Sequence, residues 1–244
     1  MKSKISMVAF LLVTTVFINA CKKESDETCR IKASISKFTY NGTVTGPDSI
    51  YYYYDKNNRI ERVEDQTGNY STYNWGDHSL EIKYHANGVL NKTFTHTLDD
   101  EGRSVEEVST FAPPNTGTSS ITRKYDDDGY LIQLTSVSTT GSVSVTINEW
   151  QNGDLIKSTY NTGSGTSTTT YTYYDDLENN GAHYLLPIYG RLTRHLTKQN
   201  VGQNASNQFY YTLDEKGNVK TQSNHYSGNN GGYVYEQSFF YQCE

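Results

Sequence analysis

The sequence predicts an all-β protein, a large antiparallel meander of hairpins that is curled or closed into a barrel-like sheet. Three observations predict this class. Apolar and polar residues alternate along most of the chain, as they do in strands with one buried face. Acidic turn motifs recur between the alternating stretches. Only 4 prolines interrupt the 244 residues, and the many Tyr, Thr and Val residues favour long strands.

The first twenty residues predict a secretory signal peptide that the mature protein lacks. Lys2 and Lys4 precede an apolar run over 7–18 that is too short to span a bilayer. The run ends in Ile-Asn-Ala-Cys at 18–21, which resembles the bacterial lipobox. This resemblance implies cleavage after Ala20 and acylation of Cys21, and several acyl chains together hold a protein on a membrane. A plain secretory signal with a chance cysteine is the alternative.

Residues 21–29 form the predicted tether, in which the acylated cysteine is followed by the charged stretch KKESDET. Glu24, Asp26 and Glu27 are similar to the acidic residues that accompany lipoprotein export to the cell surface in some bacteria with two membranes. We therefore expect an outer-membrane lipoprotein exposed at the cell surface, whose contact with the membrane is the lipid on Cys21. Residues 30–244 are expected to form a single all-β domain.

Charge and hydropathy limit the possible partners. The formal net charge is −6 and no basic stripe occurs, which argues against nucleic acid. Mean hydropathy is −0.72, and the second faces of the predicted strands carry Ser, Thr, Lys and Glu. The chain also ends in FFYQCE and lacks the terminal aromatic residue of membrane barrels. These features predict a soluble sheet that does not span a membrane.

Two cysteines remain after Cys21, one at each end of the predicted domain. In an oxidising compartment Cys29 and Cys243 are expected to form a disulfide that joins the terminal strands. Such a loop encloses almost the whole mature chain, for which loop-closure models set a ceiling on the order of 5 kcal/mol. Two free thiols are the alternative.

Acidic turns recur along the chain and reveal an internal repeat. The common form is a large apolar residue, usually Asp, two polar residues, Gly or Asn, one free position and an aliphatic residue. Asp bonds backbone amides two residues on, and Gly or Asn accepts the positive φ of the turn. Tyr54 and Ile60 flank one such turn, and pairing them across five residues puts both on one face. The turns are YDKNNRI at 54, YHANGVL at 84, LDDEGRS at 98, YDDDGYL at 125, LDEKGNV at 213 and a shorter WQNGDL at 150.

The run of four tyrosines at 51–54 is divided between the two faces of a strand. Tyr52 and Tyr54 share the phase of the turn-flanking residues and are expected in the core, whereas Tyr51 and Tyr53 point to the opposite side. The other positions expected in the core are Leu80, Ile82, Tyr84, Phe94, Leu98, Ile121, Tyr125, Phe209, Tyr211, Leu213, and the aromatic residues at odd positions from Tyr233 to Tyr241.

The turns built from tyrosine and aspartate resemble the YD repeats of Rhs-type and teneurin-type β-shells, with less regular spacing. The chain is more similar to a family of lipid-anchored bacterial proteins of unknown function that are assigned a porin-like superfold. This resemblance rests on the lipobox, the repeated YD..G.L hairpins and the segment YTYYDDLENNGAHYLLPIYG at 171–190. It implies a curled or closed meander with a long irregular loop, and it brings no activity or catalytic residue.

Chemical motifs are sparse. DDDG at 126–129 lacks an earlier ligand of a calcium loop, because that position is Lys124, so we interpret these acids as solvated turn residues. The six histidines show no paired zinc spacing, and neither G-x-S-x-G nor a phosphate loop occurs. We therefore expect no metal, no cofactor and no enzymatic activity.

The favoured function is a non-catalytic binding module of the cell envelope that takes a glycan or a protein. Aromatic rings stack on sugars and lead among interface anchors, so Tyr51, Tyr53, Trp75 and Tyr184 are the candidate ligand-binding residues. Each of them is alternatively a buried hairpin or loop residue. An envelope scaffold acting through sheet edges and a glycoside-acting enzyme with two inward carboxylates are the alternative functions.

Overall fold

The computed structural model describes residues 29–114, 116–181, 186–229 and 231–243. Within these ranges sixteen strands follow one another, and a single 3-10 turn, η1 (Pro187–Tyr189), lies between the twelfth and the thirteenth. Among the described residues no helix is both long enough and apolar enough to cross a membrane. The strands are β1 (Cys29–Tyr40), β2 (Thr43–Tyr54), β3 (Ile60–Asp65), β4 (Tyr70–Trp75), β5 (Ser79–Ala86), β6 (Val89–Leu98), β7 (Ser104–Phe111), β8 (Gly117–Tyr125), β9 (Leu131–Val137), β10 (Val143–Gln151), β11 (Asp154–Thr162), β12 (Gly165–Glu178), β13 (His195–Val201), β14 (Ala205–Leu213), β15 (Val219–Gly228) and β16 (Gly231–Cys243).

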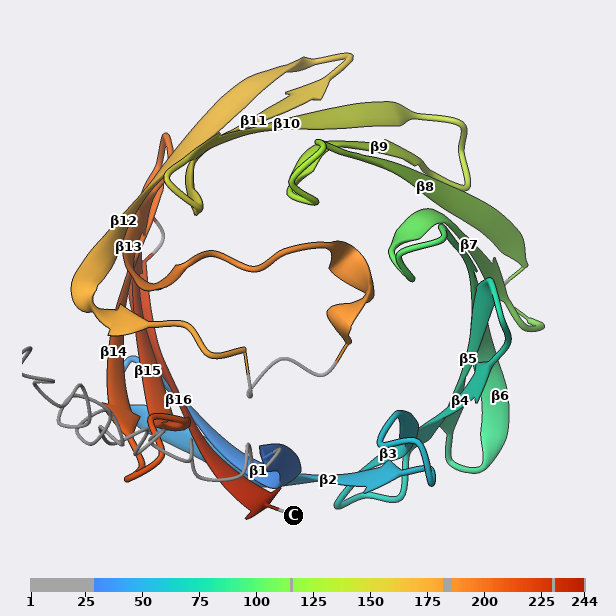
Figure 1. Ribbon diagram of the computed structural model, residues 1–244, viewed down its shortest axis with the longest axis horizontal. Coiled ribbons are helices and arrows are strands. Elements are labelled where there is room, and N and C mark those ends of the chain that lie inside the picture. Colours follow the sequence, from blue (N-terminus) through green and yellow to red (C-terminus); the bar gives the residue numbers. More distant parts are fainter. Residues whose placement is uncertain (1–28, 115, 182–185, 230, 244) are drawn as a thin grey trace, which may run out of the picture.

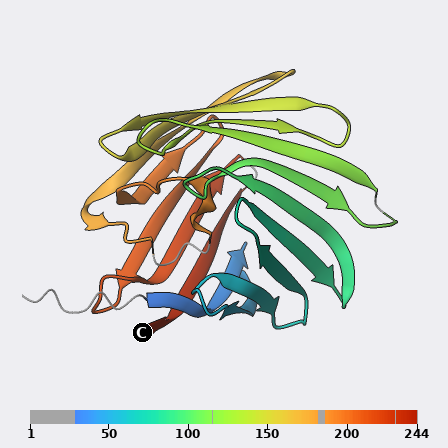
Figure 2. The same cartoon turned by 45° about the vertical axis from the view of Figure 1, so that its right-hand side comes forward.

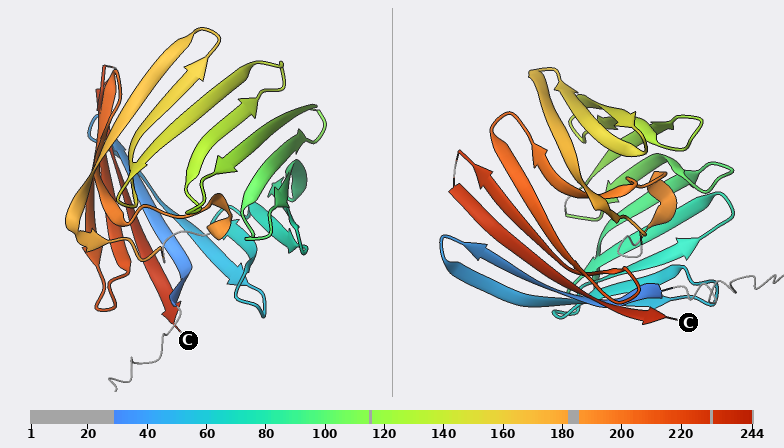
Figure 3. Two further views of the ribbon diagram at one scale, coloured as in Figure 1. Left: turned by 45° about the horizontal axis from the view of Figure 1, so that its top comes forward. Right: turned by 60° about the vertical axis from the view of Figure 1, so that its left-hand side comes forward.

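The strands form a closed antiparallel barrel. Each strand pairs with its neighbours in sequence, and β1 pairs with β16 to close the sheet (Figure 1). The connections fall alternately at the two ends of the barrel (Figures 2 and 3). Cys29 and Cys243 pair at one end and are joined by an S–S bond of 2.02 Å, which confirms the predicted disulfide. We call this end the disulfide rim and the other end the opposite rim.

Closure of the sheet corrects the fold class expected from the sequence. Polar second faces and low mean hydropathy predicted a soluble sheet that does not span a membrane. The structure shows instead a complete barrel with an even number of antiparallel strands, which is the architecture that outer-membrane barrels share. The prediction failed because alternation describes single hairpins, and a hairpin looks the same in an open sheet and in a barrel. Whether a sheet closes depends on the number of strands and on the stagger of their register, and no single hairpin reveals either quantity.

Large apolar side chains face the lumen of the barrel. The segment between β12 and β13 runs inside the ring of strands (Figure 1), and its Ile188 packs against Leu80, Ile82 and Leu98. Paired residues of neighbouring strands share a face, so the register carries this orientation around the barrel. Tyr52 and Phe239 lie in a second buried cluster on the same face. The predicted division of the tyrosine run is thereby confirmed.

Aspartate carboxylates organise five of the turns. In the β2–β3 turn Asp55 Oδ1 accepts hydrogen bonds from the amides of Asn57 and Arg59, at 2.8 and 2.9 Å, and Asn58 has a φ of 61°. Hydrogen bonds from the Arg59 and Asn57 amides hold the pKa of Asp55 below its usual range. The amide four residues on is bonded in the same way at Asp65, Asp99, Asp126 and Asp214.

Two turns depart from the predicted repeat. The turn at Asp65 has the same carboxylate geometry but lies between β3 and β4, at the opposite rim, and its sequence EDQTGNY was missed because no large apolar residue precedes the aspartate. The YHANGVL segment was aligned with the repeat, yet its turn is a short Asn87-Gly88 connection with no aspartate. Register there pairs Tyr84 with Lys92.

Aromatic side chains tie neighbouring strands together at the disulfide rim. Tyr241 Oη donates to the Val219 carbonyl oxygen at 2.8 Å, and Tyr54 Oη donates to that of Ile31 at 2.7 Å. Each bond joins an even strand to the odd strand before it, at the end where no turn links those two strands. We call these contacts the aromatic bridges. The others run from Trp75 to Ile60, Tyr125 to Ser104, Trp150 to Leu131 and Tyr173 to Leu155.

The bridges explain why tyrosine or tryptophan so often precedes the turn. The ring fills space beside the lumen, while the hydroxyl or indole N–H satisfies a carbonyl at the irregular start of the neighbouring strand. Burial raises the pKa of Tyr54 and of Tyr125 to about 12, so both hydroxyls keep their protons for donation.

Candidate functional site

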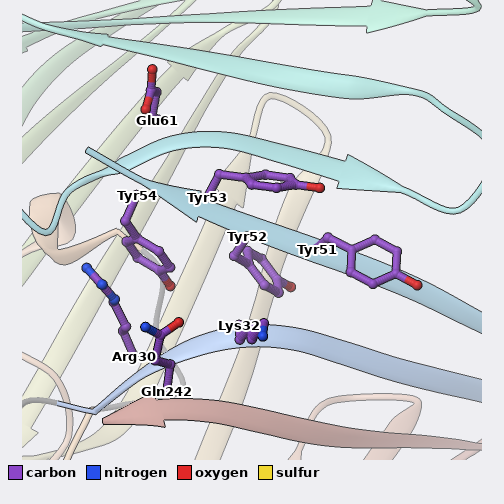
Figure 4. Close-up of a pocket in the computed structure, with 8 residues that line it drawn as sticks. All are labelled: Arg30, Lys32, Tyr51, Tyr52, Tyr53, Tyr54, Glu61 and Gln242. Carbon is purple, nitrogen blue, oxygen red and sulfur yellow. The ribbon is translucent and has the colours of Figure 1, made fainter. Parts of the chain in front are cut away.

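A hollow of about 490 Å³ lies in the wall where β1, β2, β3 and β16 meet (Figure 4). Tyr51 and Tyr53 stand on the outer side of β2, because they alternate with the luminal Tyr52 and Tyr54. Their side chains are 45% and 48% exposed, as expected for the second face of the run. The described residues that line the hollow are Arg30, Lys32, Tyr51, Tyr52, Tyr53, Tyr54, Glu61 and Gln242.

A third exposed ring stands next to this hollow. Ala33 of β1 pairs with Tyr51 on one side and with Phe240 of β16 on the other. Phe240 lies on the outer face and is 49% exposed. Since adjacent strands are about 4.8 Å apart, the backbones at Phe240 and Tyr51 are about 10 Å apart, with only a methyl group between them. We call Tyr51, Tyr53 and Phe240 the outer aromatic platform.

Sequence reasoning missed Phe240 although a signal was present. The predicted disulfide places β16 beside β1, and its odd positions are aromatic, so the even Phe240 had to face outward. The bulge between Ile31 and Ala33 shifts the pairing by one residue, and this shift brings Phe240 opposite Ala33. Such a bulge is not visible in the sequence.

Polar groups surround the platform. Glu61 supplies a carboxylate and Lys32 an ammonium group, while the Gln242 amide can both donate and accept. The Arg30 guanidinium donates to Asn58 Oδ1 and lies 4.8 Å from the centre of the Tyr54 ring, which fixes its position. The hollow thus combines aromatic rings with a cationic donor, an anionic acceptor and an amide. This combination suits a polar ligand that also has apolar C–H faces.

The other two predicted ligand-binding residues do not join the platform. Trp75 faces the lumen, where its Nε1 donates to the Ile60 carbonyl oxygen at 2.8 Å and its ring packs beside the Ile188 cluster. It therefore has the structural role that was the alternative. Tyr184 lies outside the described residues, as do residues 1–28, which include the predicted signal, Cys21 and all of the predicted tether except Cys29.

The described parts of the long segment between β12 and β13 run inside the barrel (Figure 1). Its backbone is bonded to turns at the disulfide rim, because the amides of Arg191 and Arg194 donate to the carbonyl oxygens of Gly129 and Gly153 at 2.9 and 2.8 Å. Gly190 has a φ of 84°, and a Cβ there would come within 2.6 Å of the Gly129 oxygen. Only glycine fits this approach.

A buried ionic cluster lies beneath this loop. Arg123 Nη2 donates to Glu107 Oε2 at 2.6 Å, and its Nη1 donates to Ser104 Oγ at 3.0 Å. His96 Nδ1 is 3.0 Å from the same Ser104 hydroxyl, and burial lowers the His96 pKa. Tyr189 of η1 covers the cluster, with its ring centre 4.8 Å from the Arg123 guanidinium carbon. The cluster therefore holds the inner loop as well as the wall.

The cluster also bears on catalysis. Glycoside hydrolysis requires two carboxyl groups that face each other across one cleft. The carboxylate here, Glu107, is bonded to Arg123 and to Ser109 Oγ, and Glu61 is the single carboxylate among the described residues that line the outer hollow.

The barrel is similar to a solved structure. No protein-family model and no curated protein sequence matches the chain. The crystal structure of a porin-like protein from Bacteroides uniformis aligns with a TM-score of 0.66 at 17% sequence identity, over 88% of this chain and 98% of that one. At this identity the likeness concerns the fold alone. The chain therefore has the closed barrel fold of a porin-like protein, which overturns the expected soluble sheet.

Proposed function

We propose that the chain is an envelope protein of the outer membrane that binds a glycan, without catalysis, on the outer aromatic platform. The observation that carries the proposal is the hollow beside Tyr51 and Tyr53, where three rings on the outer face of the wall are almost half exposed. Ring faces stack on sugar C–H groups, and the charged and amide groups around them match sugar hydroxyls.

The envelope location is part of the same proposal. It is supported by the lipobox at 18–21, by the likeness to a porin-like protein and by the disulfide. An acylated Cys21 is eight residues from Cys29, so a fully extended tether reaches at most about 28 Å from the disulfide rim.

The alternative functions have less support from the geometry. A scaffold acting through sheet edges needs an unpaired strand, and every described strand of this barrel is paired on both sides. A glycosidase needs a facing pair of carboxyl groups, whereas Glu107 is bonded to Arg123. A binding module is the function that requires neither feature.

Glycan binding is tested by a thermal-shift screen of the purified mature protein against host and dietary polysaccharides. A sugar that binds the native state raises the melting temperature, by an amount that grows with its concentration over Kd. The double variant Tyr51→Ala, Tyr53→Ala is expected to lose this rise. The matched control is Tyr210→Ala, which removes an outward tyrosine of β14 that is 43% exposed and lies away from the platform. A rise that survives in the double variant, or no rise with any sugar, contradicts the proposal.

Anchoring is tested separately by labelling cells with a palmitate analogue. The wild-type protein is expected to take up the label and to enter the detergent phase, and Cys21→Ala is expected to do neither. A labelled Cys21→Ala protein would refute the anchor without affecting the glycan site.

A further inference from the structure

The lumen near the opposite rim carries a second group of aromatic and amide side chains. Tyr226 stacks on Tyr233 with ring centres 4.7 Å apart and planes at 13°, and Phe38 lies 5.1 Å from Tyr233. Register places all three on the luminal face, because Tyr235, the luminal neighbour of Tyr233, pairs with Phe38. We call Phe38, Tyr40, Tyr226 and Tyr233 the luminal ring cluster. No outer-platform residue belongs to it.

Water reaches these rings from inside the barrel. Phe38 is 37% exposed and Tyr40 is 44% exposed, although both point toward the lumen. An inward ring with this exposure cannot be packed in a filled interior. The described parts of the segment between β12 and β13 are bonded to turns at the disulfide rim, at the other end of the barrel from these rings. A barrel of sixteen strands is also wider than the eight-stranded size that side chains fill.

The backbone around the cluster leaves space for the rings. A Cβ on Gly228 would lie 2.4 Å from the Tyr226 hydroxyl, so the ring extends along its own strand over this glycine. The position directly opposite Gly228 on β16 is Gly231, which also lacks a side chain. The Tyr226 ring thus extends along β15 toward the opposite rim.

Asn224 is the polar group beside this cluster that lacks a partner. It pairs with Tyr235 on one side and with Phe209 on the other, so rings flank its carboxamide. Its Oδ1 is inaccessible to water and has no hydrogen-bond partner. A buried acceptor without a partner is costly, and such an atom in a native protein calls for an explanation. The terminal torsion of asparagine is soft, so the carboxamide can turn to meet a ligand without backbone movement.

The luminal positions of β1, β14, β15 and β16 are uncharged, and a luminal cation stands on the neighbouring β13, where Lys198 Nζ lies 5.7 Å from the centre of the Tyr174 ring. The luminal residues that pair between these four strands near the opposite rim carry no formal charge. The outer face of the same strands carries the paired Lys37 and Glu236. The luminal positions concerned are Ser34, Ser36, Phe38, Tyr40, Asn207, Phe209, Tyr211, Gln222, Asn224, Tyr226, Tyr233, Tyr235 and Gln237.

We propose that the luminal ring cluster and Asn224 form a second binding site, which takes a neutral oligosaccharide. The rings offer faces for sugar C–H groups, and the amides both donate to and accept from hydroxyls. A charged sugar would lose part of its hydration in the lumen and find no ion partner on β1, β14, β15 or β16. β-barrel mouths are also common places for small-molecule sites.

The test measures binding of four neutral hexasaccharides by calorimetry, namely α-1,4-glucan, β-1,4-glucan, xylan and mannan fragments, with a hexagalacturonate as the charged probe. All measurements use the outer-platform variant Tyr51→Ala, Tyr53→Ala, so that the first site cannot contribute. At least one neutral sugar is expected to bind this protein, and the charged probe is not. Asn224→Leu should weaken binding about tenfold, the worth of one well-made hydrogen bond. Phe38→Ala should weaken it about threefold to tenfold.

Stability separates a binding role from a structural one. Leucine branches at Cγ as asparagine does and replaces the unpaired oxygen with a methyl group, so Asn224→Leu is expected to melt at the wild-type temperature or above it. A lower melting temperature would mean that the carboxamide supports the fold, which overturns the assignment. The assignment also fails if no neutral hexasaccharide binds at millimolar concentration, if the charged probe binds better, or if both variants bind as tightly as the parent. None of these outcomes depends on the outer platform, because every measurement uses the variant in which Tyr51 and Tyr53 are replaced.

Discussion

The aromatic bridges make a quantitative prediction about Tyr241→Phe. This change removes only the hydroxyl that donates to the Val219 carbonyl oxygen at 2.8 Å, and it keeps the ring in its buried cluster. Val219 is 1% exposed, so water cannot replace the lost donor without opening the rim. Leaving a buried acceptor without its partner costs about 1–3 kcal/mol. For a domain of this size that cost lowers the melting temperature by about 2–12 °C.

The measurement is thermal unfolding followed by circular dichroism, with a urea titration to check that the denaturant slope is unchanged. Tyr210→Phe is the matched control, because its ring is outward and 43% exposed, and its effect should stay within about 0.5 kcal/mol. Tyr125→Phe breaks another bridge, to Ser104, and the double variant should show the sum of the two losses. If Tyr241→Phe melts together with the wild type and the control, the bridges do not stabilise the rim, and the explanation of the tyrosine-rich sequence fails.

The buried ionic cluster makes two further predictions. Arg123→Met leaves Glu107 charged and without its ion-pair partner, which should lower the free energy of unfolding, measured in urea titrations, by about 3–5 kcal/mol. Adding Glu107→Gln should recover part of that loss. A double variant that is no more stable than Arg123→Met would contradict the pairing. Because burial depresses the His96 pKa, the unfolded chain binds the proton more tightly, so stability is fully present above pH 6.5 and is lost as the pH falls through the lowered pKa. His96→Gln should reduce the slope of stability against pH in that window, and an unchanged slope would rule out the effect.

Local features of the sequence predicted the faces of the strands and the turn-flanking pairs. Tyr54 pairs with Ile60 and Tyr125 with Leu131, as their spacing of six required. These pairings depend on a few neighbouring residues and on the period of the strand, so they are readable without the rest of the chain. The disulfide was predictable for the same reason, because only two cysteines remain after the predicted anchor.

The ionic cluster was readable in part but was missed. Arg123 stands between Ile121 and Tyr125, and His96 between Phe94 and Leu98, at positions whose phase the sequence assigns to the core. A charged or titratable residue in that phase signals a buried partner, yet alternation does not say which strand supplies it. The partner, Glu107, comes from β7, which lies between the other two strands in the barrel.

Closure and the inner loop were beyond such reasoning, for a physical reason. A sixteen-stranded barrel leaves more interior than side chains fill, so its lumen must hold chain, water or ligand. Near the disulfide rim the space is taken by the segment around Ile188 and by rings whose hydroxyls reach strand carbonyls. Near the opposite rim, Phe38 and Tyr40 face water. Rings engaged in bridges are accounted for by the fold, whereas no described bridge engages the outer platform or the luminal ring cluster, and the two binding proposals therefore rest on these rings.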